Sequence, residues 1–407
     1  GPMRQPTILA TVLCIAAVRL DAAAPATATE ATLAPEDFAI LPWGGTRPDP
    51  DILREIRECG FNLAGFVPPE GLDAVAAADL KCIVSDSHTH VGDDQAKLDD
   101  AEIARRVREL VDRVGGHPAV FGYYLRDEPS ATVYSGLARW AAACRKADPR
   151  AVPYINLFPN YASPAQLGVR TYEEYVESFI QIVKPPFVSY DHYALMDDGS
   201  LRQGYFQNLE TIRAAALRHK LPFWNIVLSN AHFRYAEPTE AGLRFQVYTT
   251  LAYGGRGIGW FTYFSPDRGN YRLAPIDPFG HKTPTWDMLR RVNLQIHKLA
   301  PVYCTLTSVN VFHVPDVPPE CRPPTSSRLL DEVSGGSFVV GEFEAPDGRP
   351  CVMVVNKSLR ESAAFHVRFK WPGQIMQVNA YTGVVRPLAG ENNWLAPGQG
   401  MLLCLRK

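Results

Sequence analysis

The sequence predicts a (β/α)8 barrel, a TIM barrel, followed by a small all-β sandwich domain. Two observations support this fold class. Short apolar runs alternate with segments of helical periodicity through residues 37–302, giving eight strand–helix units in about 265 residues, which is the length of this barrel class. After about Tyr303 the helical segments cease, and strand-like runs continue to the end of the chain.

The predicted barrel strands share a short apolar run that ends in polar or turn-forming residues. They lie at Phe38–Pro42, Phe61–Val67, Lys81–Ser85, Val120–Leu125, Val152–Leu157, Phe187–Tyr190, Pro222–Leu228 and Gly257–Phe264. The segments with helical periodicity include Ile103–Val114, Leu137–Ala147, Tyr172–Val183, Leu209–Arg218, Ala241–Tyr253 and Trp286–Leu299. Three of them are preceded by residues that cap helices: Asp99 or Asp100, Thr171, and Pro238-Thr239.

A doubly wound open sheet is the alternative to a closed barrel. Such a sheet usually has a glycine-rich turn after its first strand, and Trp43-Gly44-Gly45 does not match that fingerprint. The barrel is therefore the preferred interpretation.

Residues 303–407 are predicted to form the β-sandwich, because no segment of helical period interrupts their strand-like runs. These runs are Val309–Val314, Ser337–Phe343, Cys351–Val355, Ala363–Phe369, Gln377–Tyr381, Val384–Leu388 and Met401–Leu405. Pro346-Asp347-Gly348 is a hairpin-turn signal. The proline-rich stretch 315–327 is expected to be an extended loop.

The N-terminus is expected to carry targeting information. Gly1-Pro2 before Met3 indicates the remnant of a cleaved expression tag. Arg4, an apolar run from Ile8 to Val18 and small residues at 22–26 are typical of a secretory signal peptide. We therefore expect residues 1–26 to be removed, residues 27–36 to be a linker, and the mature protein to be secreted or periplasmic.

Composition excludes several classes of protein. There are 41 basic and 43 acidic residues, a formal charge of −2, whereas a dedicated nucleic-acid binder would show a basic excess. No later apolar run reaches the roughly 18 residues needed to span a bilayer. The eight cysteines form no CxxC pair, so a zinc knuckle is not expected, while a disulfide or two remains possible. The oligomeric state is left open.

Functional side chains of this barrel class gather where the strands end and in the loops that follow. The predicted strand ends supply carboxylates, amides, histidines and aromatic rings, which is the composition of a sugar-binding site. The candidate substrate contacts are Trp43, His88, Asp127, Asn156, His192, Tyr193, Asn230, His232, Trp260 and Tyr263. An oligo- or polysaccharide is the expected substrate.

The sharpest motif is GYYLRDEPS at residues 122–130, in which an apolar strand ends in Asp-Glu-Pro. A carboxylate there, beside aromatic rings, can hold the raised pKa that a general acid for a glycosidic oxygen needs. This motif resembles the Asn-Glu-Pro of clan A glycoside hydrolases, including family 5 and family 42 enzymes. The resemblance implies that Glu128 is the acid/base and that Asp127, in place of Asn, holds the sugar 2-hydroxyl. The alternative is a strand-end salt bridge between Glu128 and Arg126.

The second carboxylate departs from the family pattern. Retaining members of the clan place a nucleophilic glutamate at the end of strand seven, but here that strand ends in Ser229-Asn230. Asp191, at the end of strand six, is the preferred partner of Glu128. Glu237, in the turn before the next helix, is a weaker candidate nucleophile, and a helix start is its ordinary explanation.

No metal or other cofactor is expected. His88-x-His90 has metal-like spacing, but barrel metallohydrolases place such a pair on the first strand. No G-x-S-x-G motif accompanies the serines nearby, which argues against a serine hydrolase. The hypothesis is therefore an exported glycoside hydrolase with Glu128 as acid. A non-catalytic carbohydrate-binding barrel that lost its nucleophile is the main alternative, and a metal-dependent hydrolase is a weaker one.

Overall fold

The computed structural model describes residues 37–407. The predicted tag remnant, signal peptide and linker at residues 1–36 lie outside this part of the chain. Within it, no helix combines the length and the apolar character that crossing a membrane requires.

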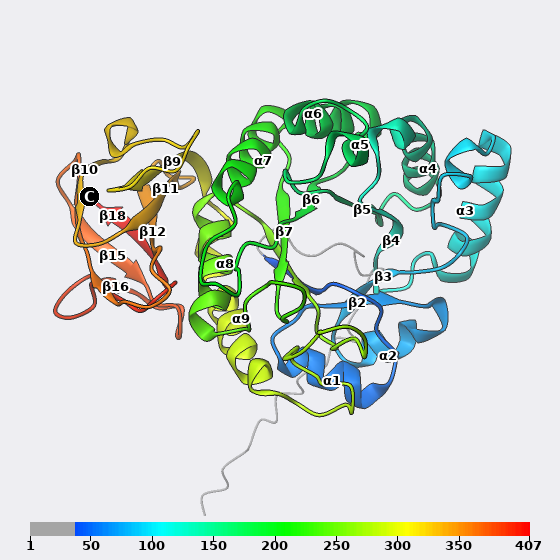
Figure 1. Cartoon of the computed structure of the whole chain (residues 1–407), viewed down its shortest axis with the longest axis horizontal. Coiled ribbons are helices and arrows are strands. Elements are labelled where there is room, and N and C mark those ends of the chain that lie inside the picture. Colours follow the sequence, from blue (N-terminus) through cyan, green and yellow to red (C-terminus); the bar gives the residue numbers. More distant parts are fainter. Residues whose placement is uncertain (1–36) are drawn as a thin grey trace, which may run out of the picture.

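The N-terminal part is the predicted barrel (Figure 1), a parallel sheet with the strand order β1-β8-β7-β6-β5-β4-β3-β2. Its strands are β1 (Ala39–Pro42), β2 (Leu63–Val67), β3 (Lys81–Val84), β4 (Val120–Asp127), β5 (Val152–Leu157), β6 (Val188–Asp191), β7 (Phe223–Leu228) and β8 (Gly257–Phe261). All eight predicted strands are confirmed. Because the strands are parallel, all their carboxyl ends open onto one face, which we call the mouth.

Asn62 helps to close the barrel between β1 and β2, which do not form a regular ladder. Its Oδ1 accepts a hydrogen bond from the Ile40 N–H at 2.8 Å, and its Nδ2 donates to the Phe38 carbonyl at 2.8 Å. Nearer the mouth, the Phe66 N–H donates to the Gly44 carbonyl at 2.9 Å. A side chain thus substitutes for the missing backbone ladder.

The helices surround the strands (Figure 1). They are α1 (Pro50–Glu58), α2 (Leu72–Ala77), α3 (Asp100–Val114), α4 (Tyr134–Ala147), α5 (Pro164–Leu167), α6 (Tyr172–Val183), α7 (Tyr205–His219), α8 (Glu240–Ala252) and α9 (Pro284–Tyr303). The predicted caps are confirmed, since the side chains of Asp99, Thr171 and Thr239 accept backbone N–H groups at the starts of α3, α6 and α8. Short 3₁₀ turns lie at Pro69–Gly71, Gln95–Lys97, Ala131–Val133 and Pro324–Ser326.

Aromatic rings fill the barrel interior below the mouth. Trp224 stacks on Phe187 at 4.2 Å between ring centroids and on Phe121 at 5.6 Å. Tyr154 lies 6.1 Å from Trp224, and its hydroxyl points into the polar layer above. The polar groups of the mouth therefore rest on a packed apolar floor, and each large ring buried there contributes about 1.5–3 kcal/mol.

The C-terminal part is the predicted all-β domain. Its main antiparallel sheet has the order β16-β15-β18-β12-β11-β9, and the pairs β10-β14 and β13-β17 complete it. The strands are β9 (Thr307–Val314), β10 (Leu330–Ser334), β11 (Phe338–Glu344), β12 (Pro350–Asn356), β13 (Ala363–Ala364), β14 (His366–Phe369), β15 (Gln374–Val378), β16 (Val385–Pro387), β17 (Trp394–Leu395) and β18 (Gly400–Arg406). Cys351 and Cys404, opposite each other on β12 and β18, form a disulfide.

The main sheet is buried on both faces. Val340 and Val352 belong to the sandwich core, whereas Val339 and Met353 pack in the same cluster as the barrel helices. The approach is close at Gly341, because a Cβ there would lie 2.0 Å from the Ala252 carbonyl oxygen of α8. The sandwich is thus packed directly on the barrel.

A buried carboxylate holds the proline-rich loop against the sandwich. Glu342 accepts hydrogen bonds from the Ser327 hydroxyl, the Asn310 amide and the Arg328 and Leu329 backbone N–H groups, at 2.5–2.9 Å. Two of these donors, Ser327 and Asn310, are themselves side chains, so one carboxylate satisfies four groups that folding removes from water.

We predict that Glu342→Ala lowers the free energy of unfolding by about 3–5 kcal/mol, because it leaves these donors without an acceptor. Urea denaturation measures the change. The matched control is Glu344→Ala, on the same strand but exposed, for which we expect a change within about 0.5 kcal/mol. Equal effects of the two substitutions would contradict the interpretation.

Candidate active site

Three carboxyl groups gather at the mouth. Asp127 ends β4, Glu128 follows it, and Asp191 ends β6. Asp127 and Glu128 are partly exposed, whereas Asp191 is buried. Strands β4 and β6 flank β5 in the sheet, so their ends face each other across one strand.

The backbone at Glu128 breaks the regular alternation of the strand. Its φ is +44°, in the left-handed region that residues other than glycine rarely adopt. The Glu128 N–H donates to the Asn156 carbonyl at 2.8 Å and holds this conformation in place. Successive strand residues normally point to opposite faces, but here Asp127 and Glu128 lie near enough to interact electrostatically. A strain of about 1–3 kcal/mol is thus held where the acidic groups meet.

Asn156 of β5 bridges two of the three acids. Its Nδ2 donates to Asp127 Oδ1 at 3.1 Å and to Asp191 Oδ1 at 2.9 Å. Its Oδ1 accepts from the Ser189 hydroxyl at 2.9 Å. All donor and acceptor groups of this buried amide side chain are therefore used inside the site.

The bridge is held by a chain of hydrogen bonds that crosses the barrel. Trp43 Nε1 donates to the Tyr154 hydroxyl at 3.2 Å, and Tyr154 and Ser189 hydroxyls lie 3.0 Å apart. Since Ser189 donates to Asn156, Tyr154 donates to Ser189. The chain orients the Asn156 amide so that its N–H groups face the carboxyl groups.

Glu128 and Asp191 are hydrogen-bonded to each other through their side chains. Two carboxylates cannot make this bond, so one of the pair carries a proton. Burial raises the pKa of Glu128, while its hydrogen bond to Asp191 acts in the opposite direction. Burial, the negative charges of Glu128 and Asp127 and the same hydrogen bond raise the pKa of Asp191 well above its ordinary range. The pair thus keeps a proton at a pH where exposed carboxyl groups have lost theirs.

Asp127 is also shifted. Burial, and then the neighbouring charge of Glu128, raise its pKa to about 7, although the hydrogen bond from Asn156 acts in the opposite direction. The site therefore holds less negative charge near neutral pH than three carboxyl groups would suggest.

Arg126 does not neutralise the acids. It donates to the Val91 carbonyl at 2.8 Å and to Asp93 at 2.9 Å. The alternative expectation, a strand-end salt bridge between Arg126 and Glu128, is wrong.

An aromatic wall forms another side of the mouth. Tyr193 stacks on Phe261 with centroids 5.5 Å apart, and Phe261 also contacts Trp43 at 5.9 Å and His232 at 5.7 Å. His232 stacks on Tyr271 at 4.5 Å. The structure thus brings together three predicted residues, Trp43, Tyr193 and His232, through a ring that the sequence analysis did not select.

No carboxylate occupies the end of β7. Asn230 is buried there, donates to the Thr262 hydroxyl at 3.1 Å and accepts from His232 Nδ1 at 2.9 Å. Burial lowers the pKa of His232 to about 4, so the ring is neutral. The structure therefore confirms that no carboxylate lies at the end of β7, where the family pattern has a glutamate.

Two predicted aromatic contacts lie away from the acid cluster. Trp260 is 0% exposed and donates through Nε1 to Asn293 of α9 at 3.0 Å. Tyr263 is buried and accepts from Trp286 of α9 at 3.0 Å. For Trp260 the reason is the alternation of strand residues, since the adjacent Phe261 is the ring that points inward. The expectation for Trp260 is corrected, whereas Tyr263 lines a cavity between the β1–α1 and β8–α9 connections.

The predicted histidines are also placed differently. His192 is buried and contacts Asn208 of α7 at 2.9 Å, on the outer side of β6. His88 contacts Asp86 at 2.5 Å and Glu109 of α3 at 3.1 Å. The exposed His90, not selected from the sequence, lies 3.0 Å from the Ser85 hydroxyl and 4.9 Å from the Tyr124 ring.

Glu237 is not part of the acid cluster. It is exposed in the turn before α8 and forms an ion pair with Arg272 at 2.8 Å. Its expected role as nucleophile is corrected, because its charge is neutralised on the surface.

The mouth offers no evident metal site. Among residues 37–407, the grouping with metal-ligand types is Glu210, His313 and Cys321, at the junction with the sandwich. The Tyr253 hydroxyl contacts Glu210 at 3.0 Å and His313 at 2.9 Å. The Lys357 ammonium donates to the other nitrogen of His313 at 3.2 Å. Glu210 and His313 therefore already have hydrogen-bond partners within the protein at this junction.

Comparisons with known proteins support the fold. A glycoside hydrolase family 5 structure from Bacteroides vulgatus ATCC 8482 matches with a TM-score of 0.58 and 11% identity, over 90% of this chain and 88% of that one. A structure described as a glycoside hydrolase matches with a TM-score of 0.56 and 11% identity, over 90% and 92%. A beta-galactosidase from the psychrophilic Marinomonas ef1 matches at 0.47 and 10% identity, and the chain spans 60% of its length. No protein-family model and no curated protein matches the sequence.

The first two likenesses, at 11% identity, show that the chain shares the fold of solved glycoside hydrolases.

We predict that Asp127→Asn changes how stability depends on pH. The pKa of Asp127 is about 7 in the folded protein and about 4 in an unfolded chain, so its ionisation removes stability as the pH rises from about 4 to about 7. At most this is worth about 4 kcal/mol, and we expect about 2 kcal/mol because the group is partly exposed. The free energy of unfolding of Asp127→Asn should therefore rise relative to that of the wild type as the pH increases across that range.

Urea denaturation at several pH values between 4 and 7 measures the difference. Asp94→Asn, at an exposed aspartate of the β3–α3 connection, is the control and should run parallel to the wild type. A parallel curve for Asp127→Asn would show that Asp127 titrates normally.

Proposed function

We propose that this protein is a glycoside hydrolase in which Glu128 and Asp191 carry the reaction. The observation that supports it most is the hydrogen bond between these two carboxyl groups at the mouth of the barrel. It keeps a proton on the pair near neutral pH, as protonation of a glycosidic oxygen requires. The likeness in fold to two solved glycoside hydrolases agrees with this proposal.

Glu128 is the proposed general acid, because it is the more exposed member of the pair. Its proton passes to the glycosidic oxygen as the bond between that oxygen and the anomeric carbon breaks. Asp127, held by Asn156, can accept a hydrogen bond from a sugar hydroxyl. The wall of Tyr193, Phe261 and Trp43 can cover the apolar face of the ring.

Asp191 is the proposed nucleophile, and it acts in its ionised form, so the proton of the pair lies on Glu128 when the sugar is attacked. Inverting enzymes keep their carboxyl groups about 6.5–9.5 Å apart to admit a water, and retaining enzymes about 5–5.5 Å. The side chains of Glu128 and Asp191 interact directly, which favours the retaining arrangement over one with a water between the two carboxyl groups. A bond forms between Asp191 and the anomeric carbon as the leaving group departs. Glu128 then removes a proton from a water whose oxygen bonds to the anomeric carbon, and the bond from that carbon to Asp191 breaks to release the sugar and the free carboxylate.

We also propose that the substrate is an oligo- or polysaccharide and that the protein is exported. The mixture of carboxyl groups and aromatic rings at the mouth supports the first proposal, and the signal-peptide pattern of residues 1–26 supports the second.

A non-catalytic carbohydrate-binding barrel is the second candidate. The observation that favours it is the Asn230–His232 pair at the end of β7, where retaining members of the clan have a glutamate. A binding protein would retain a glycan without releasing reducing sugar, and Glu128→Gln would leave its turnover at zero.

For the hydrolase we predict that Glu128→Gln lowers kcat by about 10²–10⁴-fold on glycosides with poor leaving groups, because the general acid is lost. The loss should be much smaller on 2,4-dinitrophenyl glycosides, whose leaving group needs little protonation. Steady-state kinetics on both substrate types test this. An equal loss on both would assign Glu128 another role.

We further predict that an activated 2-deoxy-2-fluoro glycoside labels Asp191 covalently, since the fluorine slows release of the sugar more than its attachment. Peptide mass mapping locates the label, and Asp191→Asn should abolish it. Glu237→Gln, at the exposed acid paired with Arg272, is the matched control and should label normally. Inverted product stereochemistry in proton NMR spectra would exclude the nucleophile role.

A further inference from the structure

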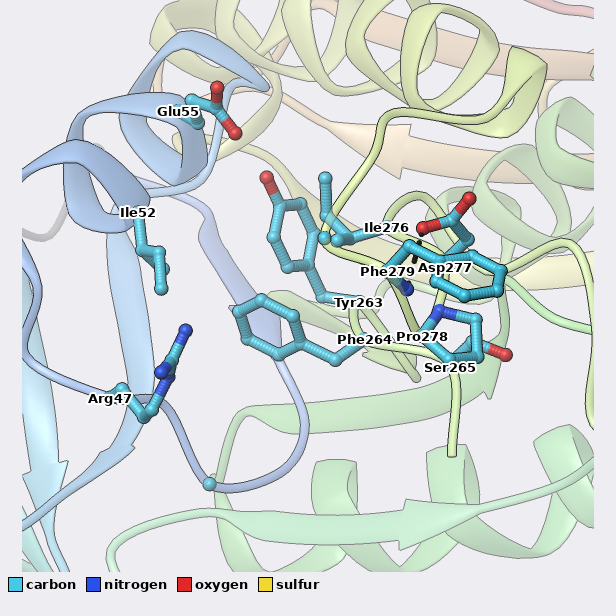
Figure 2. A pocket seen from close by; sticks show the side chains of 12 residues that line it. Arg47, Ile52, Glu55, Tyr263, Phe264, Ser265, Ile276, Asp277, Pro278 and Phe279 are labelled. Carbon is cyan, nitrogen blue, oxygen red and sulfur yellow. Dashed lines mark hydrogen bonds between the residues drawn. The ribbon is translucent and has the colours of Figure 1, made fainter. Parts of the chain in front are cut away.

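A cavity opens on the mouth face, away from the acid cluster. It has a volume of about 450 Å³ and lies between the β1–α1 connection with α1 and the long β8–α9 connection (Figure 2). That volume is within the range of small-molecule sites. A smaller cavity shares Gly45, Tyr263 and Phe264 with it and extends to Trp43. The cavity therefore adjoins the aromatic wall, on the β8–β1 side of the barrel opposite β4 and β6.

Arg47 supplies an unused cation to this cavity. Its guanidinium extends toward Phe264 and Ile52 (Figure 2). Within residues 37–407 it makes no hydrogen bond, ion pair or stacking contact, although most of the other arginines in this part of the chain are engaged. Five N–H donors are thus available on the side of the cavity formed by the first connection.

Acceptor groups line the same cavity. Asp277 uses Oδ1 to accept the N–H groups of Phe279 and His281 at 2.9 and 2.8 Å, and Oδ2 has no partner in the described structure. Glu55 is paired only loosely, with Lys282 at 3.8 Å. The Ser265 hydroxyl is buried without a hydrogen-bond partner.

An arginine and two carboxylates in one cavity indicate which kind of ligand it can bind. Arginine only donates hydrogen bonds and carboxylates only accept them, so a ligand that satisfies both must do both. Hydroxyl groups do so, whereas an anion would be repelled by Asp277 and Glu55 and a cation by Arg47. Phe279, which is 85% exposed, adds an apolar ring at the edge of the cavity.

We propose that this cavity is a subsite for a further, neutral sugar residue of the substrate. The proposal rests on the function proposed above. The acid pair on β4 and β6 would act at one end of an oligosaccharide that runs past Trp43, and Arg47 and Phe279 would hold a residue beyond the cleaved bond. The substrate is therefore an oligosaccharide or a longer chain, and a single sugar with an aryl group would leave the cavity empty.

The test compares two substrate sizes. Neutral hexasaccharides of glucose, xylose, mannose and galactose are screened beside the matching 4-nitrophenyl monoglycosides. For the hexasaccharide that is cleaved, Arg47→Ala and Phe279→Ala should each lower the ratio of kcat/KM on the hexasaccharide to kcat/KM on the monoglycoside by about tenfold or more. Tyr381→Ala, at a remote and exposed aromatic residue of the sandwich, should leave the ratio unchanged.

A binding measurement separates failure of the subsite from failure of the proposed reaction. In calorimetry with Glu128→Gln, the same hexasaccharides should bind, and adding Arg47→Ala should weaken binding by about tenfold. Unchanged kinetic ratios, unchanged binding, or no binding by any hexasaccharide would overturn the subsite. Binding that depends on Arg47 without turnover in the wild type would keep the subsite and overturn the hydrolase. Stronger cleavage of uronic-acid oligosaccharides through Arg47 would overturn the neutral ligand.

Discussion

One asparagine side chain holds the acidic cluster together. Asn156 donates to Asp127 and Asp191 at once, and its backbone carbonyl fixes the strained backbone of Glu128. Three carboxyl groups in a partly buried space repel one another, and a neutral donor that faces two of them offsets part of that cost. Protonation offsets the rest of the repulsion among the carboxyl groups. The proton that the cluster retains is the one that a general acid can donate.

The rest of the molecule supports this arrangement by packing closely below and behind the mouth. The aromatic floor around Trp224 closes the barrel below the polar layer that holds the acids. Behind the barrel, the sandwich covers α8 so closely that Gly341 admits no side chain. Apolar packing below and behind the mouth therefore offsets the unfavourable free energy of burying charged groups at the mouth, as is common for functional sites.

The strand ends could be predicted because the alternation of apolar runs and helical segments is strong, and the position of Glu128 followed from its motif. The direction in which individual strand side chains point was predicted less well. Trp260 and His192 sit next to the inward residues Phe261 and Asp191, and a one-residue error moves a strand side chain to the opposite face. Counting in steps of two from Asn156 and Asp191 leads to Tyr154 and Ser189, which complete the hydrogen-bond chain.

By itself, the sequence determined the class of fold, the order of its two domains and the position of each barrel strand to within a few residues, because these depend on local periodicity. Only the tertiary structure decided which acids touch, that Arg126 turns away from them, and that Arg47 faces a cavity with two carboxylates. Such relations join residues far apart in the chain, and they arise from the closure of the barrel, which no local pattern records.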